Sequence, residues 1–68
     1  MEEIITAVYA SVDTLKNVRD DLISVGIPQD NILVTREMMQ IQVIGPSAVE
    51  AEFEEILKRH SPVKIYKN

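Results

Sequence analysis

The amino-acid sequence predicts an α+β fold in which two helices cover one face of a four-stranded antiparallel sheet. Two segments repeat apolar residues every three or four positions, which is typical of amphipathic helices. Other segments have the β-branched residues or the period-two alternation of strands. The order strand, helix, strand occurs twice within 68 residues. Together these observations predict one compact layer of helices on one sheet.

The first half begins with an expected strand over residues 3–9, which is apolar on both faces. Ser11 is a good N-cap for the helix that follows. Gly26 is expected to end that helix in a left-handed conformation, and Pro28 prevents its continuation. The apolar stripe of the helix consists of Val12, Leu15, Val18, Leu22 and Val25.

The next two strands are expected to form a hairpin. Residues 32–35 are rich in β-branched side chains, and Arg36-Glu37 begins the reversal. Met39, Ile41 and Val43 then alternate with Gln40 and Gln42, the clearest period-two pattern in the chain. This strand should have one core face and one polar face.

The second helix is expected to open at Gly45-Pro46-Ser47, because proline suits a first helical turn. Glutamates should cover its outer side, and Pro62 precedes a short final strand over residues 63–66. The apolar stripe of this helix consists of Val49, Phe53, Ile56 and Leu57.

Two βαβ-type halves with short, right-handed connections give the ferredoxin-like βαββαβ sandwich. The expected strand order is 4-1-3-2, with both helices on one face. We expect residues 1–68 to form a single domain of this type.

Composition excludes several function classes. A net charge of −4 and a pI near 4.8 argue against nucleic acid and anionic membrane surfaces as partners. No apolar run approaches a membrane span, and Met1-Glu2-Glu3 lacks the basic start of a signal peptide, so we expect a cytoplasmic protein. Without cysteine there is no disulfide or thiolate metal site, and self-association becomes a plausible source of stability for so small a core.

Two groups of titratable residues invite a catalytic or metal-binding interpretation. His60 is the only histidine, but its neighbours supply no ligand set, and its place at a helix end is explained by the helix dipole. The glutamates of the second helix fall on its outward face, where a solvated surface is the simpler interpretation. They are Glu50, Glu52, Glu54 and Glu55.

Three further features also have structural explanations. Met38 and Met39 should point to opposite faces of their strand, which fits gap-filling better than a soft metal. Tyr9 and Tyr66 suggest RNA recognition, in which bases stack on aromatic residues of a sheet, but the third strand lacks the aromatic residues needed. Gly45 lies in a strand-to-helix turn that could hold an anion, although one glycine is a weak signal. The sequence therefore predicts no enzyme, no metal and no cofactor.

The polar face of the sheet remains as a candidate interaction surface. We expect it to carry Gln40 and Gln42 with Thr6, Val8 and, depending on register, Lys64 or Tyr66. This mixture suits a sheet-to-sheet dimer or a protein-binding surface. The alternative is that a small sheet simply leaves several apolar residues exposed.

One stretch of the first half resembles a known family. It comprises Ile5-Thr-Ala-Val-Tyr-Ala-Ser, then Leu15, Val18 and Leu22, then Gly26-Ile-Pro-Gln-Asp-Asn-Ile-Leu-Val34. Residues 4–34 thereby resemble the small bacterial domain of general, or heat-induced, stress proteins. The resemblance implies a bacterial soluble accessory protein related to stress, and it carries no catalytic residues to transfer.

Two function hypotheses follow. The first is a non-enzymatic protein-interaction or oligomerisation module that forms a homodimer, or binds a protein partner, through its open sheet face or an edge strand. The alternative is a small-molecule-sensing regulatory domain that binds its ligand at a dimer interface. An enzyme would need a convergent polar pocket, and none can be assembled from these residues.

Overall fold

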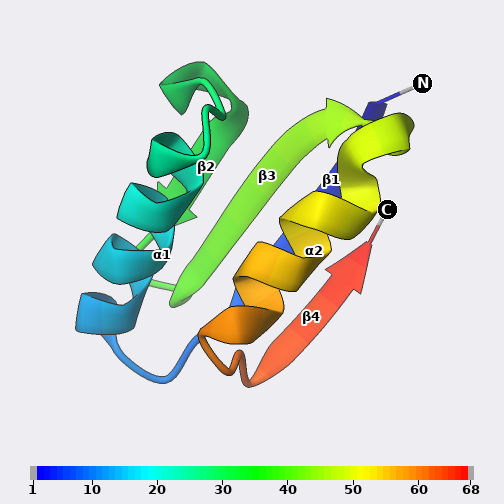
Figure 1. The fold of residues 1–68 in the computed structure, drawn as a ribbon. Coiled ribbons are helices and arrows are strands. Elements are labelled where there is room, and N and C mark those ends of the chain that lie inside the picture. The colour runs from blue at the N-terminus through cyan, green and yellow to red at the C-terminus, as the bar shows by residue number, and fades with distance from the viewer. Residues whose placement is uncertain (1, 68) are drawn as a thin grey trace.

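The computed structural model describes residues 2–67, which form one sheet and one layer of helices (Figure 1). Short 3₁₀ turns precede β2 and α2 at Gln29–Asn31 and Ser47–Val49. The main elements in chain order are β1 (Glu2–Val8), α1 (Val12–Ser24), β2 (Ile32–Thr35), β3 (Gln40–Pro46), α2 (Glu50–Arg59) and β4 (Lys64–Lys67).

The four strands form an antiparallel sheet in the order β2-β3-β1-β4. β3 pairs antiparallel with both β1 and β2, and β4 pairs antiparallel with β1. Both helices lie on the same face of this sheet, as Figure 1 shows. The predicted α+β class, four-stranded antiparallel sheet and pair of helices are confirmed. In the part of the chain that is described, no helix has the length and apolarity to cross a membrane.

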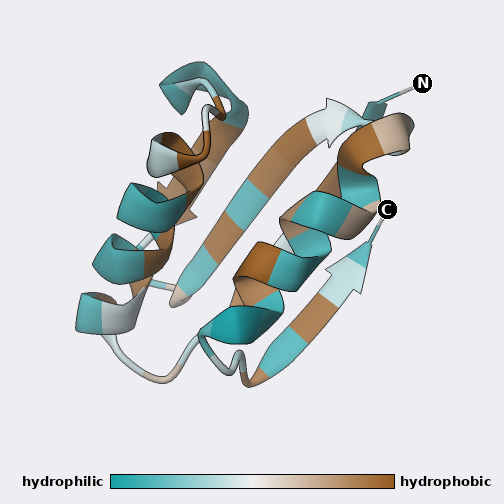
Figure 2. Cartoon of the chain, viewed as in Figure 1, coloured by the Kyte–Doolittle hydropathy of each residue, from teal (hydrophilic) through white to brown (hydrophobic). Residues whose placement is uncertain are grey.

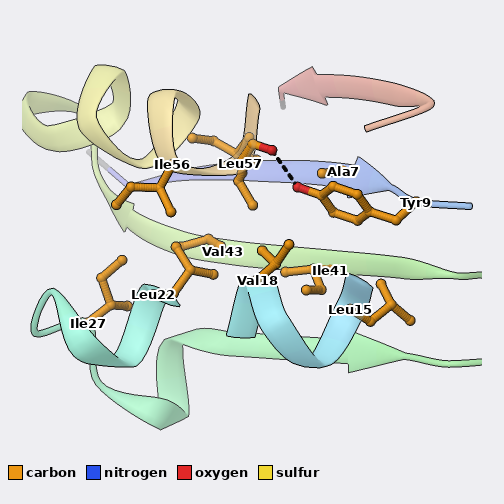
Figure 3. Close-up of a cluster of buried hydrophobic side chains, with 11 residues drawn as sticks. Ala7, Tyr9, Leu15, Val18, Leu22, Ile27, Ile41, Val43, Ile56 and Leu57 are labelled. Carbon is orange, nitrogen blue, oxygen red and sulfur yellow. Dashed lines mark hydrogen bonds between the residues drawn. The ribbon is translucent and has the colours of Figure 1, made fainter. Parts of the chain in front are cut away.

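The hydrophobic core lies between the helices and the sheet (Figure 3). It takes alternate residues of the central strands and the inner stripe of each helix, the two periodicities that the sequence displays (Figure 2). Each fully buried side chain of this size stabilises the fold by about 1.5–3 kcal/mol. The buried apolar residues are Ile5, Ala7, Tyr9, Leu15, Val18, Leu22, Ile27, Ile41, Val43, Ile56 and Leu57.

Helix α1 begins and ends as the sequence predicts. The Ser11 hydroxyl accepts a hydrogen bond from the backbone N–H of Thr14 at 3.2 Å, and Gly26 has a φ of 101°. The two ends of the predicted apolar stripe are not buried in the core: Val12 is 38% exposed and Val25 is 54% exposed. Both residues lie at the ends of the helix, so only the middle of the stripe is sealed against the sheet.

The β2–β3 hairpin corrects the prediction for the two methionines. Residues 36–39 form the turn, so Met38 and Met39 do not alternate within a strand. Met39 has a φ of 54°, packs against the core, and accepts the N–H of Tyr9 through its carbonyl at 2.8 Å. Met38 is 60% exposed. A four-residue reversal thus starts β3 at Gln40, one residue later than the apolar alternation indicates.

The second half also differs from prediction at its boundaries. Pro46 is extended, with φ −65° and ψ 145°, and it ends β3 instead of opening a helix. α2 therefore starts only at Glu50, after the 3₁₀ turn. The final strand runs one residue later than expected, and Val63 precedes it, donating its N–H to the carbonyl of Val8 at 2.7 Å.

Gly45 is needed because α2 approaches the sheet closely at this point. It is buried on the covered face of β3, and a Cβ placed there would overlap the ring of Phe53. The backbone conformation itself does not require glycine, since only Gly26 among the two glycines has a positive φ. Gly45, which the sequence suggested as part of an anion-binding turn, instead leaves room for the aromatic ring of Phe53.

We predict that Gly45→Ala lowers the free energy of unfolding by about 1–3 kcal/mol, because the new methyl group displaces the Phe53 ring. Urea unfolding followed by circular dichroism measures this change. Phe53→Leu removes the overlapping ring atoms, so the double variant should be more stable than the sum of the two single effects predicts. Strict additivity of the two substitutions would contradict this packing account.

Candidate interaction surface on the open face of the sheet

The face of the sheet that carries no helix is called the open face below. Side chains alternate between the two faces of a strand, so the residues that flank the buried core positions belong to it. The pairing registers of the strands fix which of them are neighbours. The open face consists of Glu2, Ile4, Thr6, Val8, Leu33, Thr35, Gln40, Gln42, Ile44, Lys64 and Tyr66.

All six residues that the sequence analysis singled out lie on this face. Gln42 and Tyr66 flank Thr6, and Gln40 and Lys64 flank Val8. Lys64 and Tyr66 are both present, because residues two apart in a strand point the same way. The structure therefore places the candidate residues side by side in two rows across the sheet: Thr6, Gln42 and Tyr66, and then Val8, Gln40 and Lys64.

Exposure within the open face is uneven, and this changes which residues can make contacts. Thr6 and Gln40 are only 1% and 8% exposed, because neighbouring side chains cover them. Tyr66 and Leu33 are 48% and 54% exposed. The accessible apolar area thus comes chiefly from the two edge strands.

Leu33 is the exposed apolar residue of this face that sequence reasoning missed. It pairs with Gln42 in the row that also contains Thr6 and Tyr66. The sequence contained a signal for this position, because Ile32 and Val34 flank Leu33. Only one of the two alternating sets of side chains in a strand can face the core. Extending the alternation of β3 across the hairpin to β2 would have placed Leu33 on the open face.

One hydrogen bond joins two polar side chains at the centre of the open face. The Gln42 side-chain amide Nε2 donates to the Thr6 hydroxyl at 3.3 Å. No buried side-chain nitrogen or oxygen within residues 2–67 lacks a hydrogen-bond partner. The bond between Gln42 and Thr6 can persist when water is removed from the face, whereas the remaining amide groups of Gln40 and Gln42 would need partners on the covering surface.

The covered face has a polar network that corrects the prediction of a purely solvated glutamate face on α2. Lys67 of β4 lies 2.8 Å from Glu50 and 3.4 Å from Glu54, and Lys58 lies 3.2 Å from Glu54. The hydrogen bond from Lys58 lowers the pKa of the Glu54 carboxyl, and the hydrogen bond to Glu50 raises the pKa of Lys67. These contacts tie α2 to the β4 edge.

His60 has a specific partner in addition to the helix end at which the sequence placed it. It caps α2, and its Nε2 lies 3.0 Å from Oδ2 of Asp21 on α1. Arg59 Nη1 lies 3.5 Å from the same oxygen. The prediction attributed His60 to the helix dipole alone, whereas the structure shows a contact between the two helices.

Tyr9 is a core residue and cannot stack a base. It is 1% exposed, and its hydroxyl donates a hydrogen bond to the backbone carbonyl of Leu57 at 2.7 Å (Figure 3). Burial raises the pKa of the Tyr9 phenol to about 12. Only Tyr66 of the two tyrosines lies on the open face, so the sheet presents no aromatic pair to a nucleic acid.

The two larger hollows found among residues 2–67 lie outside the open face. One, of about 440 Å³, lies between the loop after α1 and the start of α2, with Ile27, Phe53 and Ile56 among its apolar lining. The other, of about 540 Å³, lies between α1 and β2. Across residues 2–67 there is no cluster of three or more histidine, aspartate or glutamate side chains placed to hold a metal ion.

Comparisons with known proteins identify no relative. No family model matches the chain, no curated protein matches it, and no solved structure matches it. The resemblance of residues 4–34 to the stress-protein domain therefore stays a prediction.

We predict that Tyr9 makes stability fall in strong alkali. The folded phenol has a pKa of about 12, against 10.0 for the unperturbed group, so between these values the unfolded state releases a proton that the folded state keeps. The free energy of unfolding should then decrease as pH rises from about 10 to about 12. In Tyr9→Phe this decrease should be smaller, and at neutral pH the variant should be about 1 kcal/mol less stable through loss of the hydrogen bond. Urea titrations at several pH values test both statements, and an equally steep alkaline decrease in Tyr9→Phe would contradict the first.

Proposed function

We propose that this fold is the ferredoxin-like βαββαβ sandwich. Counted from the β4 edge, the strand neighbours run β4-β1-β3-β2. β1 and β2 are parallel with β3 between them, and β3 and β4 are parallel with β1 between them. Two interleaved βαβ units of this kind support the assignment.

We propose that the protein is a non-enzymatic self-association module that forms a homodimer by packing its open face on the open face of a second copy. The observation that carries the proposal is an uncovered sheet face with exposed apolar side chains on both sides of a hydrogen-bonded polar pair. Leu33 and Tyr66 supply exposed apolar area on its two sides, and the Thr6–Gln42 pair lies between them. Interfaces combine such apolar contacts with satisfied polar groups.

The charge on the open face favours a second copy as the occupant. Its only charged residues are Glu2 and Lys64, which lie at opposite ends of the face, with Lys64 beside Val8 at the far end of β1. A two-fold axis that runs across the strands reverses their direction, and so brings Lys64 of one copy toward Glu2 of the other. Such self-complementarity is what an isologous interface requires.

The area of the face sets the strength of the dimer. Two strands of seven residues and two of four, at about 3.3 Å per residue and about 4.8 Å per strand, give a face of about 350 Å² per copy. A standard stable interface buries about 800 Å² per partner. The dimer should therefore be weak, with a dissociation constant between about 10 µM and 1 mM.

The alternative function is a small-molecule-sensing regulatory domain. The sequence predicts the ligand at a dimer interface, whereas the hollow of about 440 Å³ favours a site within one copy, because a largely apolar hollow of this volume is typical of small-ligand sites. A ligand that binds the folded state raises the melting temperature. Thermal unfolding with panels of amino acids, nucleotides and metal ions tests this function, and a flat response removes it.

We predict that sedimentation equilibrium up to about 2 mM protein detects a monomer–dimer equilibrium in this range. Leu33→Glu should weaken dimerisation at least tenfold, because it buries an unpaired carboxylate in the interface. Val25→Glu is the matched control: Val25 is also 54% exposed, but it follows α1 on the other layer.

Circular dichroism should show both variants folded, since each substitution is at an exposed position. A strict monomer in the unsubstituted protein would overturn the proposed dimer. Equal weakening by Val25→Glu would place the contact on the helices and overturn the open face as the site.

A further inference from the structure

The hollow between α1 and the edge strand β2 has an apolar floor and a basic rim. Its volume is about 540 Å³. We call it the β2 groove, and it is separate from the open face because it lies on the helix side of the sheet. It is lined by Val12, Leu15, Lys16, Arg19, Val34, Arg36 and Glu37.

Positive charge predominates in the β2 groove, where Lys16, Arg19 and Arg36 outnumber Glu37, although the whole chain carries a net charge of −4. Lys16 and Arg36 form no ion pair with any residue from 2 to 67. Arg19 has only Asp20 at 3.7 Å, and the two side chains are 36% and 58% exposed, so this pair contributes little. By contrast, a carboxylate lies within ion-pair distance of each of Lys58, Arg59 and Lys67. The β2 groove thus attracts anionic groups.

The strand beside this groove has a free edge. β2 pairs only with β3, so alternate backbone N–H and C=O groups along residues 32–35 face away from the sheet. Nothing charged occurs within β2 itself, whereas the other edge strand, β4, begins and ends with a lysine. Lysines on an edge strand oppose the addition of a further strand. β2 is therefore the edge that is open to pairing.

We propose that the β2 edge and the β2 groove together bind an extended acidic segment of a partner protein, which adds to the sheet as a further strand. Strand addition supplies affinity through main-chain hydrogen bonds and specificity through alternate side chains. In such a segment, every second side chain would face the groove. Acidic side chains there would meet Lys16, Arg19 and Arg36, and the alternate, apolar side chains would lie on the opposite side of the sheet, beside Leu33.

A second copy of this chain is the less favourable occupant of this edge. Pairing β2 with β2 of another copy would bring two basic grooves together, and like charges in contact oppose association. An acidic segment reverses the sign of that interaction. The inference is thus independent of the proposed dimer, which uses the opposite face of the sheet.

Fluorescence anisotropy with a labelled peptide of about eight residues, alternating glutamate and valine, tests the inference. We expect saturable binding at about 0.05 M salt that is strongly weakened at about 0.5 M salt, because the contacts are screened. Lys16→Glu and Arg36→Glu should each weaken binding at least fivefold. Both positions are exposed, so both variants should keep the circular dichroism spectrum of the unsubstituted protein.

Three controls separate strand addition from simple charge attraction. Lys64→Glu, an exposed lysine on the open face, should leave binding unchanged. A lysine–valine peptide should not bind, and N-methylation of alternate peptide amides should abolish binding of the glutamate–valine peptide, because a new strand needs those hydrogen bonds.

Several outcomes would overturn the inference. Equal binding of the N-methylated peptide would show that no strand is added. Equal weakening by Lys64→Glu would show a general effect of net charge. Competition by free glutamate or inorganic phosphate as effective as that by the peptide would show a small-anion site instead.

Discussion

The arrangement of this molecule depends on one topological constraint: its two strand–helix–strand units are related by a half-turn about an axis normal to the sheet. β1 and β2 lie parallel on either side of β3, and β3 and β4 lie parallel on either side of β1. When two such units have crossovers of the same hand, that half-turn places both helices on one face. The other face is left without a covering element from residues 2–67, and the open face is the direct result (Figure 1).

Helix α2 is joined to the sheet by a few specific contacts in addition to apolar packing. The Tyr9 hydroxyl holds the end of α2 through the carbonyl of Leu57, and Lys67 holds its first turns through Glu50. Gly45 lets the Phe53 ring sit against β3. α2 thus contacts the sheet at several points along its length.

Much of the fold could be predicted from the sequence because each element carries a local signal. Ser11 and Gly26 define α1, and the alternation from Gln40 to Val43 defines β3 and its two faces. The six residues predicted for the polar face share it for the same reason, since a period of two fixes relative orientation. Local patterns were sufficient where the physical cause was itself local.

The sequence was insufficient where the cause is tertiary. Nothing near Met39 in the chain indicates that a left-handed residue will end the hairpin turn, and nothing near Glu50 indicates that Lys67 will reach it. The low exposure of Thr6 arises from residues on neighbouring strands. Such contacts join residues far apart in the chain, and no window of sequence contains both partners.

The central claim is that the open face is a contact surface for a second copy. Amide chemical shifts recorded by NMR from about 0.05 to about 2 mM protein test it most directly, because they locate the contact as well as detect it. We predict concentration-dependent shifts at Leu33, Gln42 and Tyr66, with α1 and α2 unchanged. Spectra that do not change with concentration, or changes confined to the helices, would contradict the claim.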